Sequence, residues 1–202
     1  MTEFDGPAAQ SQMQPVPREN RRPPSRPGDP RLGAVLMLLY EKEQQMHLVL
    51  TRRRDDLQAH AGQISLPGGR QEPQETLRET ALRETREEVG VPPAAITILG
   101  QLTSLYIFPS DFEVHPFVGW HDGVPAFRPQ PAEVAEIIET PLAAFFDEQT
   151  RREEMWEWRD NPLQVPFFQI GEHKVWGATA MILSDFVERV RAVQADNPVA
   201  GR

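Results

Sequence analysis

The sequence contains no cysteine among its 202 residues. This absence excludes disulfide bonds, thiolate metal sites and a cysteine nucleophile. Because disulfides mark oxidising compartments, their absence is consistent with the reducing interior of a cell. We therefore expect a cytoplasmic protein.

Long apolar runs are also absent. The run 34–40 (AVLMLLY) is the size of a strand, whereas a membrane-spanning helix needs roughly 18 apolar residues or more. Near the start of the chain, Glu3 and Asp5 stand where a secretory signal would place basic residues before an apolar stretch. The sequence thus predicts neither a membrane partner nor a secretory signal.

Basic residues are in the minority. Lysine and arginine number 21 against 30 acidic residues, which gives a net charge of −9. A general nucleic-acid binder needs a basic face, so we expect no nucleic-acid partner. A phosphorylated small molecule is still compatible, because divalent cations bridge carboxylates to phosphates. On charge alone, solubility is the simpler interpretation.

The length predicts one domain with tails. Residues 1–30 are rich in proline and have little apolar periodicity, which predicts a flexible N-terminal segment. We expect the domain over 31–195 and a C-terminal tail over 196–202.

Apolar periodicity predicts strands, then one helix, then more strands and a closing helix, hence an α/β fold with a mixed sheet. The central helix carries Leu77, Ala81 and Val89 on one face, Thr76 and Glu79 have capping-box spacing at its start, and Gly90 stops it. Strands are predicted over 32–40, 47–51, 96–102, 105–108 and 114–120, helices over 141–150 and 180–193, and either over 132–139.

The central helix carries three glutamates, Glu84, Glu87 and Glu88, at spacings that place them on adjoining parts of one face. Such carboxylates repel one another unless a hard cation such as Mg²⁺ or Mn²⁺ binds them. Arg83 can brace one acid, and the backbone carbonyl of Gly69 can add a ligand. The alternative is a solvated helix of mixed charge.

The spacing favours the metal site. Gly69, Glu75, Arg83-Glu84, Glu87-Glu88 and Gly90 stand in the pattern Gly-x5-Glu-x7-Arg-Glu-U-x-Glu-Glu-x-Gly-U, where U is aliphatic. This segment resembles the signature of the Nudix hydrolases and departs from it only at Thr85. The resemblance implies a Nudix α/β/α sandwich with a mixed β-sheet and the Nudix-box loop-helix-loop. It also implies pyrophosphohydrolase activity with Mg²⁺ or Mn²⁺ as cofactor.

The resemblance also implies roles for single residues. Glu84, Glu87 and Glu88 are the metal ligands, Gly69 adds its carbonyl, and Arg83 orients the acids. Nudix enzymes differ in the residue that serves as general base. Candidates here are Glu87 and a glutamate of the segment 133–136, for which we take Glu136 as catalytic. Surface acids on a strand are the alternative for that segment.

The segment Leu50–Gly69 resembles the additional signature of coenzyme A pyrophosphatases, Leu-Thr-x-Arg followed by Leu-x-x-His-x-Gly-Gln and Phe-Pro-Gly-Gly, with Leu66 in place of the phenylalanine. It implies hydrolysis of coenzyme A to 4′-phosphopantetheine and adenosine 3′,5′-bisphosphate. The candidate substrate-binding residues are Arg52, Arg53, His60 and Gln63. The alternatives are a basic strand end paired with nearby aspartates and a histidine that only shapes a turn.

Two other functions compete. One is a broader Nudix hydrolase that acts on ADP-ribose or other nucleoside diphosphate derivatives. The other is a non-catalytic nucleotide-binding module, which the complete set of box glutamates disfavours. The sequence leaves open whether the protein is a monomer or a homodimer.

Overall fold

The computed structural model describes residues 4–16, 29–57, 60–108, 110–158 and 161–196. Within these residues no helix is both long and apolar enough to cross a bilayer. The helices and strands are α1 (Gly6–Ser11), β1 (Arg31–Lys42), β2 (Gln45–Arg53), β3 (Ile64–Ser65), β4 (Gly68–Arg70), α2 (Leu77–Val89), β5 (Ile96–Gln101), β6 (Leu105–Ile107), β7 (Phe112–His121), β8 (Val134–Pro141), β9 (Arg151–Trp158), β10 (Asn161–Ile170), β11 (His173–Trp176) and α3 (Gly177–Asp196), with short 3-10 helices at Pro93–Ala95 and Leu142–Phe145.

The larger sheet has mixed strand directions. Its strands follow the order β3-β2-β1-β7-β5, with β4 paired to β1, β6 to β7 and β8 to β2. The pairing of β1 with β7 is parallel, and the other pairs are antiparallel. The predicted α/β class with a mixed sheet is therefore confirmed.

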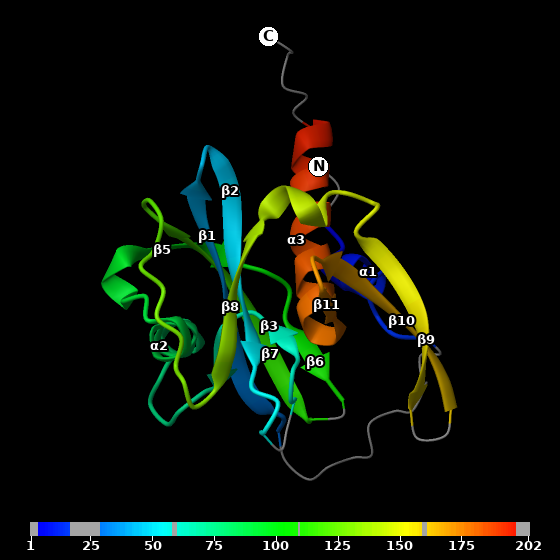
Figure 1. Ribbon diagram of the computed structural model, residues 1–202, viewed down its shortest axis with the longest axis horizontal. Helices are drawn as coiled ribbons and strands as arrows, with labels where there is room; N and C mark the ends of the chain where they lie inside the picture. Colours follow the sequence, from blue (N-terminus) through cyan, green and yellow to red (C-terminus); the bar gives the residue numbers. More distant parts are fainter. Residues whose placement is uncertain (1–3, 17–28, 58–59, 109, 159–160, 197–202) are drawn as a thin grey trace.

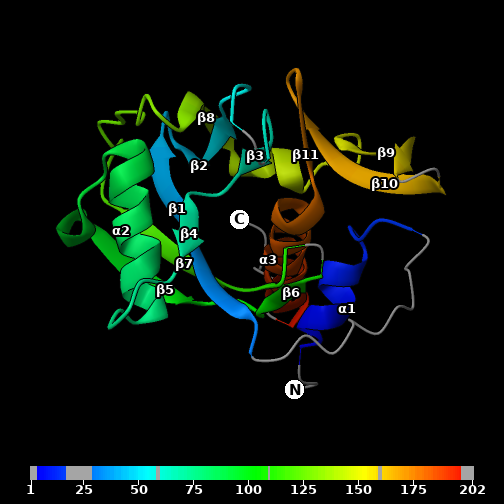
Figure 2. The same ribbon diagram turned by 90° about the horizontal axis from the view of Figure 1, so that it is seen from below.

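Helices cover both faces of this sheet (Figures 1 and 2). Because side chains alternate along a strand, Leu36 of β1 belongs to the core cluster of Val89 of α2, whereas its neighbour Met37 belongs to that of Leu183 of α3. The helix that carries the glutamates thus lies on one face, and the closing helix lies on the other.

The smaller sheet, β11-β10-β9, flanks α3. Phe168 and Val175 anchor it in the same core cluster as α3. The charged stretch 151–158 forms its outer strand β9, where the Trp156 ring lies edge-on to Trp176 with 4.7 Å between centroids.

Both ends of α2 lie where the sequence predicts them. Thr76 and Glu79 form the predicted capping box, in which each side chain accepts from the backbone N–H of the other residue. At the other end, Gly90 has φ of 79°, a left-handed conformation that suits glycine. The predicted strands are present as well, and residues 134–139 of the ambiguous segment belong to strand β8, which a turn over 131–133 precedes.

The N-terminal segment differs from the prediction. Within the segment predicted to be flexible, residues 6–11 form α1, whose N-cap is Asp5, and α1 packs on α3. Met13 is fully buried in the core, and Ser184 of α3 donates a hydrogen bond to the Ala9 carbonyl. A few apolar contacts thus order a segment whose composition predicted disorder. Residues 1–3 and 17–28 of this segment, like residues 197–202 of the predicted tail, lie outside the described residues.

The helix predicted over 141–150 is wrong. Strand β8 runs to Pro141, and only a short 3-10 helix, Leu142–Phe145, follows. Thr150 donates its hydroxyl to the Ala144 carbonyl at 2.7 Å, and the Asp147 carboxylate accepts from the Gln149 N–H at 2.9 Å. These side chains compete with helical backbone bonds and close a turn instead.

Candidate active site

The site begins where β4 meets α2. Gly69 of β4 pairs with Ala34 of β1 and faces the helix. A Cβ built on Gly69 would lie 2.4 Å from the Glu84 carboxylate oxygen, so this carboxylate rests directly on the Gly69 backbone. Only glycine permits that approach, which places the Glu84 carboxylate against the backbone of β4.

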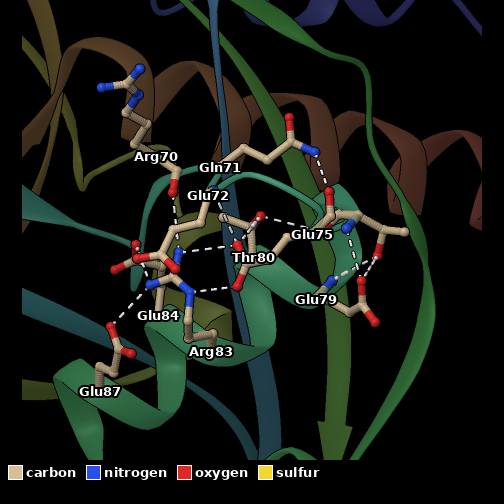
Figure 3. Close-up of polar contacts among 10 residues, drawn as sticks. Arg70, Gln71, Glu72, Glu75, Glu79, Thr80, Arg83, Glu84 and Glu87 are labelled. Carbon is tan, nitrogen blue, oxygen red and sulfur yellow. Dashed lines mark hydrogen bonds and ion pairs between the residues drawn. The ribbon is translucent and has the colours of Figure 1, made fainter.

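Arg83 holds the acids of the helix in place (Figure 3). Its Nε donates to Glu75 at 2.6 Å, and its Nη1 donates to Glu84 at 2.9 Å and to Glu87 at 3.0 Å. Its Nη2 donates to the carbonyl of Arg70 at 3.1 Å. These bonds, the one to Glu75 foremost, raise the pKa of Arg83 above its usual range. The predicted orienting role fits this placement.

The two inner glutamates are desolvated. Glu88 is 8% exposed, and burial followed by the charge of Glu84 raises the pKa of Glu88 to about 8, against an opposing hydrogen bond from the Gly68 backbone. Burial likewise raises the pKa of Glu84, while Arg83 opposes this shift. Two buried carboxylates that repel each other are costly to ionise unless a cation lies between them.

The donor set fits a hard divalent cation. Glu84, Glu88 and the Gly69 carbonyl offer only oxygen, which Mg²⁺ and Mn²⁺ prefer. Within the described part of the chain, no three acidic or histidine side chains already converge on one point. Glu87 is half exposed, and its Oε2 accepts from the same Arg83 nitrogen that holds Glu84.

The loop between β2 and β4 brings His60 and Gln63 together. The Arg53 N–H donates to the Gln63 carbonyl at 2.9 Å, and the Gly62 N–H donates back to the Arg53 carbonyl at 3.2 Å. His60 adopts a left-handed φ of 59°, with its Nδ1 2.8 Å from the Gln63 amide oxygen. The loop residues Gln58 and Ala59 lie outside the described residues.

Arg52 and Arg53, both predicted to bind substrate, lie in different surroundings. Arg53 forms an ion pair with Glu133 at 3.4 Å, and its positive charge acts on Glu88. Arg52 instead contacts Asp55 at 2.9 Å and Glu136 at 3.5 Å. Of these two arginines, Arg53 is the one whose charge lowers the pKa of Glu88.

The two glutamates of the segment 133–136 also lie in different surroundings. Glu133 acts electrostatically on both Glu84 and Glu88. Glu136, the predicted catalytic residue, pairs with Arg52 and with His173 of β11, each at 3.5 Å. Among the ion pairs and hydrogen bonds of the described residues, none joins Glu136 to the box glutamates. The structure thus brings Glu133 to the site, and sequence spacing alone could not choose between the two.

Comparison with known proteins shows which family model and which relatives this chain matches. Residues 30–163 match the model of the NUDIX domain. The chain is 34% identical over 170 residues to the uncharacterized Nudix hydrolase NudL of Photorhabdus laumondii, which covers 84% of this chain and 90% of that protein. It is 33% identical to the chloroplastic Nudix hydrolase 22 of Arabidopsis thaliana, where the match covers 76% of this chain and 53% of the relative.

Solved structures share the fold. A Nudix hydrolase from M. smegmatis, RenU, superposes with a TM-score of 0.55 at 16% identity and covers 87% of this chain and 92% of its own. A MutT/nudix family protein from Enterococcus faecalis gives a TM-score of 0.56 at 18% identity, over 85% of this chain and 66% of its own.

Proposed function

Because this chain belongs to the Nudix hydrolase family, we propose that it hydrolyses the diphosphate bond of coenzyme A. The products are 4′-phosphopantetheine and adenosine 3′,5′-bisphosphate. The family supplies the reaction type, the hydrolysis of nucleoside diphosphate derivatives. The coenzyme A substrate is the part that we add.

The loop 50–69 carries the choice of substrate. Its sequence resembles coenzyme A pyrophosphatases, and Thr51 of this segment lies 3.5 Å from Glu88 of the box. Arg53, the fixed arginine of that pattern, lies beside Glu133 and acts on Glu88. A guanidinium beside the metal-ligand glutamates is suited to a diphosphate, which it contacts through charge-assisted hydrogen bonds. This placement of Arg53 is the observation that supports the proposal.

Glu84, Glu88 and the Gly69 carbonyl are the proposed ligands of Mg²⁺ or Mn²⁺, with Glu87 joining them. When bound, the cation neutralises the diphosphate and lowers the pKa of the attacking water. Arg83 holds Glu84 in its position on Gly69, so this one ligand is in place before substrate arrives.

We assign the general base to Glu133 rather than Glu136. Its carboxylate is half exposed and lies close enough to Glu84 and Glu88 for their charges to interact. A proton leaving a water at the glutamate cluster therefore has an acceptor there, while Arg53 holds that acceptor in place.

Product analysis tests the proposal. The purified protein is incubated with coenzyme A and Mg²⁺ or Mn²⁺, and the products are identified by mass. We expect the two products named above, and we expect Glu84→Gln and Glu88→Gln each to remove most of the turnover while the far-UV circular dichroism is unchanged. Intact coenzyme A would contradict the substrate assignment, and full activity in both variants would contradict the metal site.

A further inference from the structure

We propose that Arg52 forms a second anion subsite, which recognises a phosphate group of the substrate other than the diphosphate. The inference rests on the proposed function and deepens it. It assigns different phosphates to the two neighbouring arginines of β2. Arg53 contacts the diphosphate that is cleaved, and Arg52 contacts the other phosphate group.

The strand itself separates the two arginines. Val49 packs in the core cluster of α2 and Leu50 in that of α3, so successive side chains of β2 point to opposite faces. Thr51, on the α2 side, lies 3.5 Å from Glu88. Arg53 acts on Glu88 as well, whereas Arg52 contacts residues on the α3 side.

The Asp55 carboxylate is the anion that Arg52 contacts in this structure. Both of its carboxylate oxygens accept from Nη1 of Arg52 at 2.9 Å. The Asp55 side chain is 73% exposed and that of Arg52 is 28% exposed. Exposed ion pairs contribute little, about 0–1 kcal/mol, so a phosphate dianion can displace this carboxylate from Arg52 at small cost.

Two further residues keep Arg52 in position. Glu136 of β8 lies 3.5 Å from its Nε, and the other oxygen of Glu136 lies 3.5 Å from Nε2 of His173 on β11. The His173 side chain is only 14% exposed. Glu136 and His173 are thus positioning residues. They hold the Arg52 guanidinium on the β11 side of the loop when a phosphate has displaced the Asp55 carboxylate.

Coenzyme A carries a phosphate group that such a subsite can bind. It carries a phosphate on the ribose 3′ position as well as the diphosphate, and 3′-dephospho-coenzyme A lacks only that group. The two compounds therefore separate binding at Arg52 from hydrolysis of the diphosphate, which they share.

The test compares kcat/KM for both compounds in the wild-type protein and in Arg52→Gln. We expect a loss of about ten- to a hundredfold for coenzyme A, mostly in KM, because a charge-assisted hydrogen bond is lost. Activity on the dephosphorylated compound should be unchanged, which also shows that the variant is folded. Arg54→Gln is the matched control, since Arg54 pairs with Asp56 and the Pro131 carbonyl, and it should change neither value.

The positioning role is tested through the same ratio. Glu136→Gln should lower the preference for coenzyme A in the same direction as Arg52→Gln, and the double variant should be no worse than Arg52→Gln alone. Equal losses for both compounds in Arg52→Gln, or no loss, would overturn the subsite while leaving the proposed function intact. A wild-type protein that cleaves neither compound would overturn both.

Discussion

The Glu84 carboxylate lies in the space that a side chain on Gly69 would fill. The closest approach of an added Cβ is 2.4 Å, which is well inside van der Waals contact. A methyl group at Gly69 must push the Glu84 carboxylate away from the backbone of β4. Displacing a catalytic group by about 1 Å costs on the order of a hundredfold in rate. Gly69→Ala should therefore reduce kcat by about that factor in a steady-state assay.

Gly100→Ala is the control for this substitution. Gly100 also lies in a strand of the larger sheet, but an added Cβ there meets nothing within 4 Å. Its activity should equal that of the wild-type protein. If Gly69→Ala also kept full activity, the close contact with Glu84 would have no catalytic role.

Glu133→Gln should lower kcat with little change in KM. Removing the charge removes the proposed proton acceptor, and a general base typically contributes about 10²–10⁴-fold. The pH profile of kcat should also lose its acidic limb, because the group that must be deprotonated is gone. An unchanged kcat and pH profile would show that Glu133 is not the general base, and Glu87 would then be the candidate.

Glu88 makes the stability of the metal-free protein depend on pH. Its folded-state pKa of about 8 lies above the ordinary value of 4.5, so the folded state binds the extra proton between these limits. The free energy of unfolding should therefore fall as pH rises from about 5 to 8, by at most about 1.4 kcal/mol per pH unit. Thermal unfolding in the presence of a chelator measures this.

Glu88→Gln is the reference, because its amide does not titrate. The difference between wild type and Glu88→Gln should grow toward pH 8 and shrink when Mg²⁺ is added. Parallel pH curves without metal would show that Glu88 is not desolvated in the folded protein.

Met13→Ala tests the ordered N-terminal segment. Met13 is fully buried, and truncating such a side chain costs about 2–5 kcal/mol. The midpoint of thermal unfolding should fall accordingly, whereas Val16→Ala, at a side chain 46% exposed, should change it little. Equal midpoints for both variants would indicate that the segment does not stabilise the domain.

Short-range signals predicted the catalytic helix well. The capping box at Thr76, the left-handed stop at Gly90 and the glutamate spacing all depend on residues within a few positions of each other. A helix fixes the relative positions of such residues, so the pattern of the sequence predicts their geometry directly.

The features that the sequence did not predict depend on strand register and on contacts between distant parts of the chain. Whether Glu133 or Glu136 meets the box depends on how β8 pairs with β2, and that pairing shifts between Arg52 and Arg53. Nothing in the local sequence marks this shift. The burial of Met13 likewise depends on partners far along the chain, which composition does not reveal.

A competition assay tests the central claim most directly. Equal concentrations of coenzyme A and ADP-ribose are mixed with the protein and Mg²⁺, and both substrates and their products are followed by mass spectrometry. We predict that coenzyme A is consumed first and yields adenosine 3′,5′-bisphosphate. Faster consumption of ADP-ribose, with coenzyme A left intact, would contradict the assignment.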